Sequence, residues 1–568
     1  MNRRTGCFAV ALLTAFLFSV CTCLAQKTGP GYSIKMNRMI PTRDGTQLEA
    51  WVFLPDGAGK VPTVFSLTQY DIDAAHSFPT FVKRGYAYVQ VYVRGRGSSG
   101  GEKTEDLGVQ VGQDGADVVE WIAKQPWSDG HVVMFGGSYV GMTQWRTAAQ
   151  NPPHLSGIAP YVPIYPGWDI PNTNGIPQAW TNVILGFVSG RSLNTGFISN
   201  QDYWYGKMLE HYAAHGSFRD LSSFIGVNPD DWWMLDPQGK KESMINVWLD
   251  HVGDEAFNLA AEPKPAQFAA MKFPVLTVTG FYDDDQPGAL HYYRRYLKYA
   301  SAEAASHLYL VIGPWDHGGT QHPQKEIMAI AIPENAVLDM NKLHADWYDW
   351  ILGRGPQPQF LKDKVAYFML GADEWRYAHS LEGASSGKNL QLYLGDPAGT
   401  PKDIFQSGTL EDKPANAQPP AILVDDPHEL PEVAMAAYVP DEGLASQFRD
   451  FQKRALVFHS EPLTSAVETA GQMHLRLTIQ SDAPDFDLWA QVLMVMPDGS
   501  TVRLGEDIQR ARFREGFFKE ELLKPDQIAE IGFEFSWLAR RIPAGARIRV
   551  TIAPLNSPIY QKNYNTGG

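Results

Sequence analysis

Short apolar segments that alternate with an amphipathic helical pattern constrain the fold of this chain more than any other feature. Residues Val61–Leu67, Tyr86–Val93 and Val132–Phe135 are runs of mostly apolar and β-branched side chains, which are typical of buried strands. Between the second and third runs, residues 114–124 place apolar side chains on one face of a helix. Strands that alternate with helices in this way predict a parallel sheet covered by helices on both faces.

This alternation is interrupted once. Residues 152–265 hold many tryptophans among Asn, Pro and Gly, with irregular helical stretches, and we interpret them as an insertion. Further strands are predicted at Phe273–Thr279 and Leu308–Ile312. The sequence therefore predicts one α/β domain in two parts, residues 26–151 and 266–355.

The hydrophobic period changes to two after Pro356. Short alternating segments separated by turn signals are typical of a β-sandwich. We expect an all-β domain over residues 356–568, with strands at Gln391–Leu394, His474–Ile479, Leu488–Leu493 and Ile548–Ile552.

The N-terminal segment resembles a secretory signal peptide. Two arginines precede an apolar run, Cys7–Val20, and Cys23-Leu24-Ala25 then offers a small-x-small cleavage site. The alternative is a membrane anchor, but the run is shorter than the roughly 20 residues that span a bilayer, and no second run of that length follows. We expect residues 1–25 to be removed near Ala25 and the mature protein to be periplasmic or secreted, with no membrane association.

Cysteine content and charge exclude several classes of function. Cys7, Cys21 and Cys23 are the only cysteines, and all lie in the predicted signal peptide, so the mature chain has no disulfide, thiol nucleophile or thiolate metal site. Lys and Arg number 48 against 63 Asp and Glu, a net charge of −15. Removing two arginines with the signal peptide gives 46 − 63 = −17. An acidic chain of this kind is not expected to bind nucleic acid.

A glycine-rich motif, Phe135-Gly-Gly-Ser138-Tyr-Val-Gly141, lies where a strand ends and a helix, predicted over Met142–Ala149, begins. A serine hydroxyl becomes a useful nucleophile when a sharp turn exposes it beside a base, and glycines allow the backbone to form such a turn. Ser138 is therefore a candidate nucleophile. The alternative is a glycine-rich strand-to-helix turn without chemical function.

Two later strand ends supply candidate partners for Ser138. Asp283 follows one strand in Gly280-Phe-Tyr-Asp283, and His317 follows the next in Gly313-Pro-Trp-Asp-His317. The order Ser, Asp, His with each residue after a strand is that of α/β hydrolases. The histidine would take the serine proton, and the aspartate would hold the ring. A capping aspartate and a surface histidine are the alternatives, and the nearby competitors are Asp284, Asp285, Asp316 and His322.

A tetrahedral intermediate also needs hydrogen-bond donors for its oxyanion. The backbone N–H of Tyr139, which follows the candidate nucleophile, is one candidate. The hydroxyl of Tyr70, just after the first predicted strand, is the second. On spacing alone, a tyrosine at this position is more often a packed aromatic side chain.

These residues resemble the serine hydrolase family that includes cocaine esterases, α-amino acid ester hydrolases and Xaa-Pro dipeptidyl peptidases. The resemblance runs from about residue 40 to residue 567. Besides the three motifs above, it is carried by Arg94-Gly-Arg-Gly-Ser-Ser-Gly-Gly101, Gln125-Pro-Trp-Ser-Asp-Gly130, Ser460-Glu-Pro-Leu463, Ser481-Asp-Ala-Pro-Asp-Phe-Asp487 and Asn563-Tyr-Asn-Thr-Gly567.

The resemblance implies an α/β-hydrolase domain with a helical cap inserted at residues 152–265, followed by a C-terminal jelly roll. It also implies that Ser138, Asp283 and His317 form a catalytic triad, with the Tyr70 hydroxyl and the Tyr139 amide as oxyanion donors. No cofactor is implied. The run Asp283-Asp-Asp285 can be interpreted as a Mg²⁺ or Ca²⁺ site because hard cations bind carboxylates, but no second cluster supports it, and we expect no metal.

Substrate specificity is the least constrained prediction. α-Amino acid ester hydrolases bind the ammonium group of their substrate with a carboxylate cluster, and two matching positions here hold Asp285 and Gln286. Asp285 is thus a candidate for substrate-amine binding, and Asp169 is a weaker candidate from the cap. We expect an exported serine hydrolase that cleaves a small ester or amide, or a short peptide. The alternatives are an Xaa-Pro dipeptidyl-peptidase-like exopeptidase and an inactive binding protein on a hydrolase scaffold. The sequence leaves the oligomeric state open.

Overall fold

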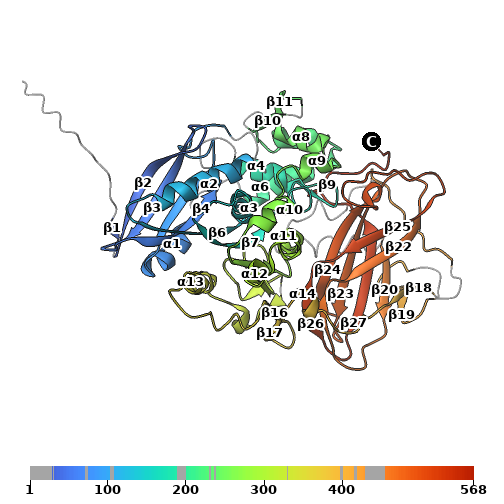
Figure 1. The fold of residues 1–568 in the computed structure, drawn as a ribbon. Helices are drawn as coiled ribbons and strands as arrows, with labels where there is room; N and C mark the ends of the chain where they lie inside the picture. Colours follow the sequence, from blue (N-terminus) through green and yellow to red (C-terminus); the bar gives the residue numbers. More distant parts are fainter. Residues whose placement is uncertain are drawn as a thin grey trace, which may run out of the picture.

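A computed structural model describes residues 28–29, 31–70, 74–102, 108–188, 200–228, 232–235, 238–328, 330–396, 401–414, 419–428 and 455–567. Within these ranges the chain forms an α/β domain with a mostly helical insertion, followed by an all-β domain (Figure 1). The predicted signal peptide, residues 1–25, lies outside the described residues.

An eleven-stranded sheet forms the centre of the α/β domain, with the strand order β1-β2-β3-β5-β4-β6-β7-β12-β13-β16-β17. The run from β5 to β16 is parallel, whereas both ends of the sheet are antiparallel. The strands are β1 (Thr28–Gly29), β2 (Tyr32–Pro41), β3 (Gln47–Pro55), β4 (Val61–Thr68), β5 (Ala87–Tyr92), β6 (Ser128–Ser138), β7 (Leu155–Pro163), β12 (Val275–Gly280), β13 (Leu308–Gly313), β16 (Val365–Met369) and β17 (Glu374–Ala378).

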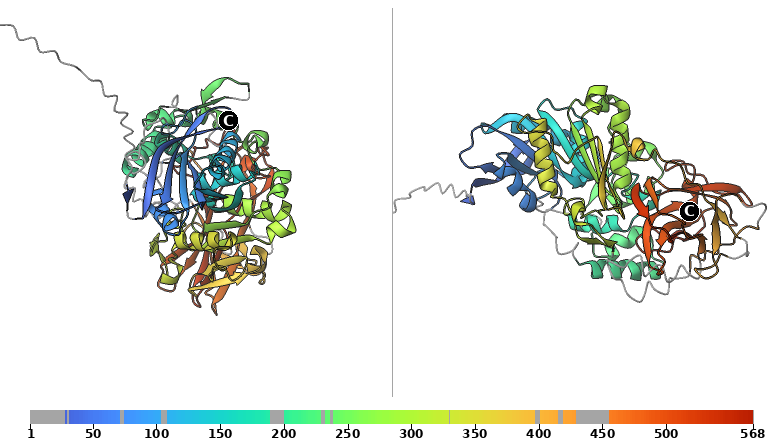
Figure 2. Two further views of the ribbon diagram at one scale, coloured as in Figure 1. Left: turned by 60° about the vertical axis from the view of Figure 1, so that its left-hand side comes forward. Right: turned by 90° about the horizontal axis from the view of Figure 1, so that it is seen from below.

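Helices cover both faces of this sheet, as the alternating pattern predicts (Figure 2). Helix α1 (Ala74–Lys83) packs against α13 (Met340–Ile351) on one side. The other side carries α2 (Gln110–Ala123), α3 (Tyr139–Ala148), α10 (Pro265–Ala270) and α11 (Gln286–Tyr299), with the short helices α12 (Ala302–Ala305) and α14 (Leu381–Ala384) further along the chain. Because β4, β5, β12 and β13 are buried along their whole length, they consist of continuous apolar runs with no alternation.

The insertion between β7 and α10 carries most of its regular structure as short helices. Its clusters of buried tryptophans and aliphatic side chains are separate from the main core. The described elements are β8 (Asn172–Thr173), β9 (Ile176–Pro177), α4 (Trp180–Val188), α6 (Gln201–Ala213), η1 (Phe218–Asp220), α7 (Leu221–Phe224), β10 (Trp233–Leu235), β11 (Lys241–Ser243), α8 (Met244–Asp250) and α9 (Glu255–Asn258).

The C-terminal domain is built from strands, as its two-residue period predicts. A six-stranded sheet has the order β18-β19-β20-β27-β23-β24, and β21 pairs with β26 and β22 with β25. These strands are β18 (Tyr393–Gly395), β19 (Gly408–Glu411), β20 (Leu456–Ser460), β21 (Val467–Gly471), β22 (His474–Gln480), β23 (Asp487–Val495), β24 (Thr501–Arg510), β25 (Ile528–Glu534), β26 (Leu538–Ile542) and β27 (Arg547–Pro554). The remaining described elements are one small strand pair, β14 (Glu326–Ile327) with β15 (Ile330–Ala331), and two 3-10 helices, η3 (Glu334–Ala336) and η5 (Ala511–Phe513).

Two strands that lie after the boundary predicted at residue 356 pair with the large sheet. Strand β16 pairs in parallel with β13, and β17 pairs with β16, so the large sheet extends to Ala378. Leu370, just after β16, also exchanges backbone hydrogen bonds with β26 of the all-β domain. A five-residue apolar strand does not reveal in its sequence which sheet it joins, and here the crossover helix α13 directs β16 back into the parallel sheet.

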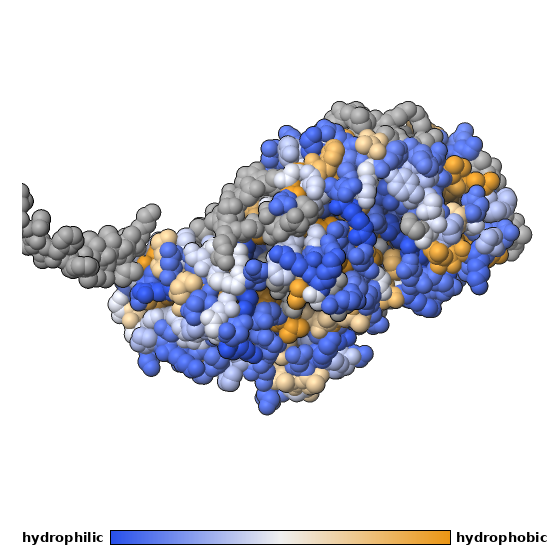
Figure 3. All heavy atoms as spheres, turned by 90° about the horizontal axis from the view of Figure 1, so that it is seen from above, coloured by the Kyte–Doolittle hydropathy of each residue, from blue (hydrophilic) through white to orange (hydrophobic). Residues whose placement is uncertain are grey.

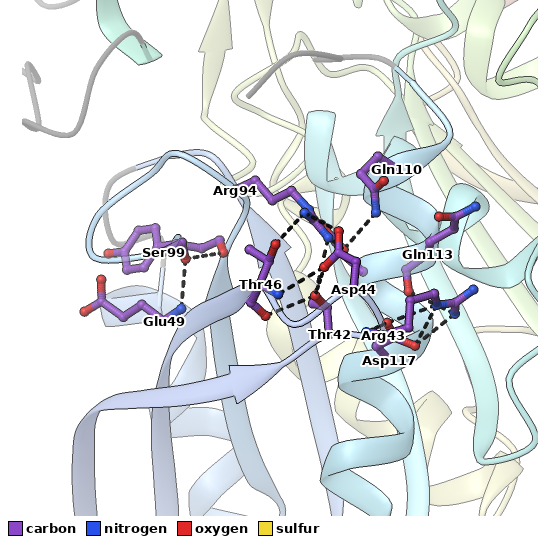
Figure 4. A network of polar contacts seen from close by, with 12 residues as sticks. Thr42, Arg43, Asp44, Thr46, Glu49, Arg94, Ser99, Gln110, Gln113 and Asp117 are labelled. Carbon is purple, nitrogen blue, oxygen red and sulfur yellow. Dashed lines mark hydrogen bonds and ion pairs between the residues drawn. The ribbon is translucent and has the colours of Figure 1, made fainter. Parts of the chain in front are cut away.

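The motif at residues 94–101 is fixed to the rest of the α/β domain by a network of charges (Figure 4). The Arg94 guanidinium contacts the carboxylates of Asp114 at 2.6 Å and Asp44 at 2.8 Å. The Ser99 hydroxyl donates to the Tyr92 carbonyl and accepts the backbone N–H of Glu49. These bonds join the loop after β5 to strand β3, the turn before it, and helix α2.

One face of the molecule is largely hydrophilic, with apolar side chains in small separate groups (Figure 3). Among the described residues, no helix is both long enough and apolar enough to cross a membrane.

Candidate active site

Ser138 lies at a one-residue turn between strand and helix. It is the last residue of β6, and α3 begins at Tyr139, three residues earlier than predicted. Its backbone has φ 58° and ψ −125°, a strained conformation for a residue with a side chain. The strained turn reverses the chain without a loop and leaves the serine half-buried, with its side chain in no hydrogen bond among the described residues.

The glycines around Ser138 are required by close packing. A Cβ atom on Gly136, where φ is +143°, would overlap with the side chain of Val140 in the first turn of α3. A Cβ atom on Gly137 would overlap with the ring of Tyr161 in β7. The turn can form because neither residue carries a side chain.

A buried glutamine supports the turn from below. Gln144 in α3 donates from its amide to the Gly136 carbonyl at 2.9 Å and accepts the Ala159 N–H of β7 at 2.9 Å. It therefore ties the helix to both strands on which it sits. Its function cannot be recognised from sequence because its partners lie on two different strands.

The Tyr139 amide directly follows the candidate nucleophile. Tyr139 is the first residue of α3, and the first amides of an α-helix have no partner within the helix. They also form the positive end of the helix dipole, which favours an anion. Tyr139 is 1% exposed, and its function as an oxyanion donor stays a prediction.

Tyr70 lies beside the same turn. It follows β4, and its ring lies edge-to-face on the Tyr139 ring, with 6.2 Å between the ring centres. It also stacks on Phe187 of the cap helix α4 at 6.0 Å. Buried Arg96 fixes the backbone before Tyr70, because it donates to the Gln69 carbonyl and to the carbonyl of Val188 at the end of α4.

Asp283 and His317 meet at the carboxyl ends of β12 and β13. Nδ1 of His317 lies 3.2 Å from Oδ1 of Asp283. The Asp283 side chain is fully buried, whereas the His317 side chain is 51% exposed. Ser138 and His317, both described, form no hydrogen bond to each other, and such bonds often tighten only when substrate is bound.

Backbone hydrogen bonds between two loops produce this Asp–His contact. Beyond the strands, the Phe281 N–H donates to the Gly313 carbonyl at 2.9 Å and the Tyr282 N–H to the Trp315 carbonyl at 3.0 Å. Gly280 permits this approach, since a Cβ atom there would overlap with the Trp315 carbonyl.

A second tertiary contact fixes the Asp283 loop to the all-β domain. The side chain of Gln286, which is 1% exposed, donates to the carbonyls of Gly280 and Trp537 and accepts the Trp537 N–H. This link could not be predicted from the sequence, since it depends on a residue 251 positions away.

The charges around His317 favour its protonated form. Burial opposes the charge, but the Asp283 carboxylate, and then Asp285 and Asp284, raise the pKa of the ring to about 10. A histidine of this kind holds a proton strongly once it has taken it from a nucleophile.

The other candidate residues have different surroundings. Asp285 is 5% exposed, and its Oδ2 lies 3.5 Å from Nδ1 of His317. Asp284 is exposed, and Asp316 accepts the Gly319 N–H within its own turn. Asp169 of the cap is buried and accepts the Tyr165 N–H.

Ligand atoms of Asp283, Asp285 and His317 lie within 4.8 Å of one another, which is close enough to hold a metal ion. Two of these atoms are already in contact as an aspartate and a ring nitrogen. The absence of a metal is still a prediction.

A parallel sheet covered by helices, a serine at a strained turn between strand and helix, and an Asp–His pair after the next strands define a serine hydrolase of the α/β-hydrolase class. The profile of the X-Pro dipeptidyl-peptidase (S15 family) matches residues 44–319, and that of the X-Pro dipeptidyl-peptidase C-terminal non-catalytic domain matches residues 361–568.

Known proteins are similar over nearly the whole chain. The cocaine esterase of Rhodococcus sp. (strain MB1 Bresler) is 28% identical over 94% of this chain and 93% of its own length. A putative serine esterase of Mycobacterium tuberculosis (strain CDC 1551 / Oshkosh) is 22% identical over 90% of this chain and 89% of its own. The structure of an α-amino acid ester hydrolase is 20% identical, with a TM-score of 0.77 over 98% of this chain and 94% of that one.

The chain therefore belongs to the serine hydrolase family that includes cocaine esterases, α-amino acid ester hydrolases and Xaa-Pro dipeptidyl peptidases. The predicted fold class is confirmed: an α/β-hydrolase domain followed by an all-β domain.

Proposed function

We propose that the protein hydrolyses a small carboxylic ester or amide through an acyl-enzyme on Ser138. The observation that carries this proposal is the placement of Ser138 at a strained strand-to-helix turn, together with the buried Asp283 that contacts His317. Each of these features costs folding free energy, because strained backbone and buried carboxylates are both unfavourable, and catalysis gives a reason for the fold to keep them.

Catalysis would proceed in two steps, acylation of Ser138 and hydrolysis of the acyl-enzyme, and in each step His317 gives back the proton that it takes. His317 takes the proton of Ser138 as the serine oxygen attacks the substrate carbonyl, and the oxyanion accepts hydrogen bonds from the Tyr139 N–H and the Tyr70 hydroxyl. The C–O or C–N bond then breaks, and His317 gives the proton to the leaving alcohol or amine. Water repeats the attack on the acyl group, which releases the acid and restores Ser138.

The pKa of His317 sets the expected pH dependence. Only the neutral ring can take the serine proton, and the neighbouring carboxylates raise this pKa to about 10. We therefore expect kcat/KM to rise as the pH increases above neutrality.

The test is the intact mass of purified protein after reaction with a fluorophosphonate probe. Wild type should gain one adduct, and Ser138→Ala should gain none while its thermal unfolding is similar. Folded wild type that gains no adduct would contradict an activated serine. An adduct that persists in Ser138→Ala would place the nucleophile elsewhere.

An exopeptidase that requires a free substrate amine is the second candidate. The family description supports it. Exposed Asp284 also supports it, because it lies next to the candidate triad, and desolvation together with the negative charges of Asp283 and of Glu506 in β24 raises its pKa, so further carboxylates are available near the site. Asp285 is the candidate from sequence for binding the substrate amine, and this function stays a prediction; its Oδ2 lies 3.5 Å from Nδ1 of His317.

A pair of esters that differ only in an α-amino group separates the two functions. A 10-fold or larger preference for the amino ester, lost in Asp284→Asn, would favour the exopeptidase. Equal kcat/KM values for both esters would favour the simple esterase.

We also propose that the protein is exported, on the basis of the apolar segment and cleavage signal in residues 1–25. Expression of the full chain in a Gram-negative host should yield a mature protein in the periplasm or medium that begins near Gln26. A cytoplasmic product that retains Met1 would contradict export.

A further inference from the structure

Asp285 lies at an unusual position for an aspartate. It is the N-cap residue of α11, where an Asp side chain normally accepts a backbone N–H of the first helical turn. Here the side chain makes no such hydrogen bond. Capping therefore does not explain its orientation, which is toward His317.

The side chain and the backbone of Asp285 both contact the Asp–His pair. Oδ2 of Asp285 lies 3.5 Å from Nδ1 of His317, the same ring nitrogen that lies 3.2 Å from Oδ1 of Asp283. The Asp285 N–H donates to Oδ1 of Asp283 at 2.7 Å. One residue thus holds the carboxylate that contacts the ring and also offers the ring a second acceptor.

This arrangement is unfavourable for folding alone. Asp285 is 5% exposed, and Oδ2 of the neighbouring Asp283 is buried without a hydrogen-bond donor among the described residues. Asp169 of the cap lies against the first turn of α11, and its buried Oδ2 also has no hydrogen-bond donor among the described residues. Several buried carboxyl groups close to one another repel when ionised, and the His317 imidazole lowers the pKa of Asp285.

We propose that Asp285 is a positioning residue for His317, which holds the Nδ1 edge of the ring jointly with Asp283. This inference rests on the proposed function of Ser138 and His317. An imidazole whose Nδ1 is hydrogen-bonded to Asp283 and lies close to the Asp285 carboxylate loses both contacts when it rotates about its Cβ–Cγ bond. The ring then presents Nε2 to the nucleophile in every cycle.

The charged groups that face Asp285 come from three segments. Asp283 and Asp284 lie on its own loop, His317 lies on the loop after β13, and Asp169 lies in the cap. Burial and the two loop carboxylates raise the pKa of Asp285 to about 8, against the opposing effect of His317. Its ionisation therefore depends on the charge of the ring that it contacts.

The test compares Asp285→Asn with a matched N-cap aspartate. Asp339 caps α13, and its side chain does accept a helix amide, the Lys342 N–H at 2.9 Å. Ester kinetics and the rate of fluorophosphonate labelling are measured from pH 5 to 10 for wild type, Asp285→Asn and Asp339→Asn. A second comparison sets Asp283→Asn against the double variant Asp283→Asn/Asp285→Asn.

Asp285→Asn should lower kcat about 10-fold with KM changed less than about twofold, because the ring is held less well in the transition state. The acid limb of kcat/KM should shift to lower pH by about one unit, since a negative neighbour of His317 is removed. Asp339→Asn should keep the wild-type pH profile and nearly the wild-type thermal stability, because Asn caps a helix about as well as Asp. The double variant should be slower than Asp283→Asn alone.

Three results would overturn the positioning function: an unchanged pH profile in Asp285→Asn, a loss confined to KM, or a double variant equal to Asp283→Asn. Failure of the proposed function gives a different result, because wild type itself would then gain no adduct at Ser138. If Asp285→Asn does not fold, Asp285→Glu provides the second variant, with a partial return of rate expected from its longer carboxylate. A loss confined to KM in folded Asp285→Glu would also contradict the proposal.

Discussion

The two halves of the candidate active site are built in opposite ways. The nucleophile half is local: Ser138, its glycines and the first turn of α3 follow one another within a few residues, and the partners of the turn lie on the adjacent strand. The acid–base half is assembled from distant segments, with Asp283 and His317 on two loops that are joined by backbone hydrogen bonds and tied to the all-β domain through Gln286. Local geometry can be encoded in a short motif, whereas an assembled geometry depends on the whole fold.

Removing the nucleophile should have the largest effect. Ser138→Ala should lower kcat by about 10³-fold or more, because the remaining oxyanion donors and substrate binding supply only the residual rate. Ester hydrolysis checks this result. Ser138→Gly should be as inactive but more stable by about 1–3 kcal/mol, since glycine adopts φ 58° without strain. A Ser138→Gly variant that melts below wild type would show that the turn is not strained.

A methyl group placed in the turn should break the local half. Gly137→Ala should destabilise the protein by about 1–3 kcal/mol and abolish most activity, because the added Cβ overlaps with the Tyr161 ring. Chemical denaturation and ester kinetics measure the two effects. Gly59→Ala is the control, as a Cβ there meets nothing within 4 Å. Wild-type activity in Gly137→Ala would mean that the turn tolerates a side chain.

The same contrast explains what the sequence could predict. Ser138 and the Tyr139 amide were recognisable because the turn is encoded by consecutive residues, and the buried strands were recognisable from their continuous apolar runs. Gln144 and Gln286 gave no signal, since each is defined by bonds to segments that only folding brings together.

Two features concern the partner of a residue rather than its local structure, and neither could be predicted. The pairing of β16 with the parallel sheet has no signal in the sequence, because an apolar strand does not identify its partner. The contact between Asp285 and His317 joins two loops that only folding brings together.

Loss of the link to the all-β domain should weaken the assembled half alone. Gln286→Leu leaves the Gly280 and Trp537 backbone groups without partners, at about 1–3 kcal/mol for each buried group, and frees the Asp283 loop. We expect kcat to fall about 10-fold, with a smaller change in KM. Gln125→Leu, which removes one bond within its own helix end, is the control. Equal rates in both variants would show that the loop keeps its geometry without the all-β domain.

Stability should vary with pH through the assembled half. The pKa of Asp285 is raised to about 8, so the folded protein keeps a proton there that the unfolded chain loses above about pH 4. The contribution of Asp285 to the free energy of unfolding is therefore largest at low pH and is lost as the pH rises through 8. His317 acts in the same direction, because its pKa is raised to about 10 and its contribution is lost above neutrality.

Asp285→Asn should consequently flatten the dependence of Tm on pH between about pH 5 and 9 and be more stable than wild type at the alkaline end. Differential scanning calorimetry at a series of pH values measures this change. Parallel Tm curves for the two proteins would contradict a raised pKa at Asp285.

The smallest expected effect is that of metal removal. Asp283, Asp285 and His317 have the spacing of a metal site, but a bound cation would need the lone pair of Nδ1, and in the proposed mechanism that nitrogen carries the proton donated to Asp283. Dialysis against EDTA should therefore leave kcat and Tm unchanged, because the orientation of the ring comes from carboxylates alone. Activity that disappears with EDTA and returns with a divalent cation would show that the assembled half is a metal centre. The distant contacts would then serve to place the ligands of a metal ion rather than an Asp–His pair.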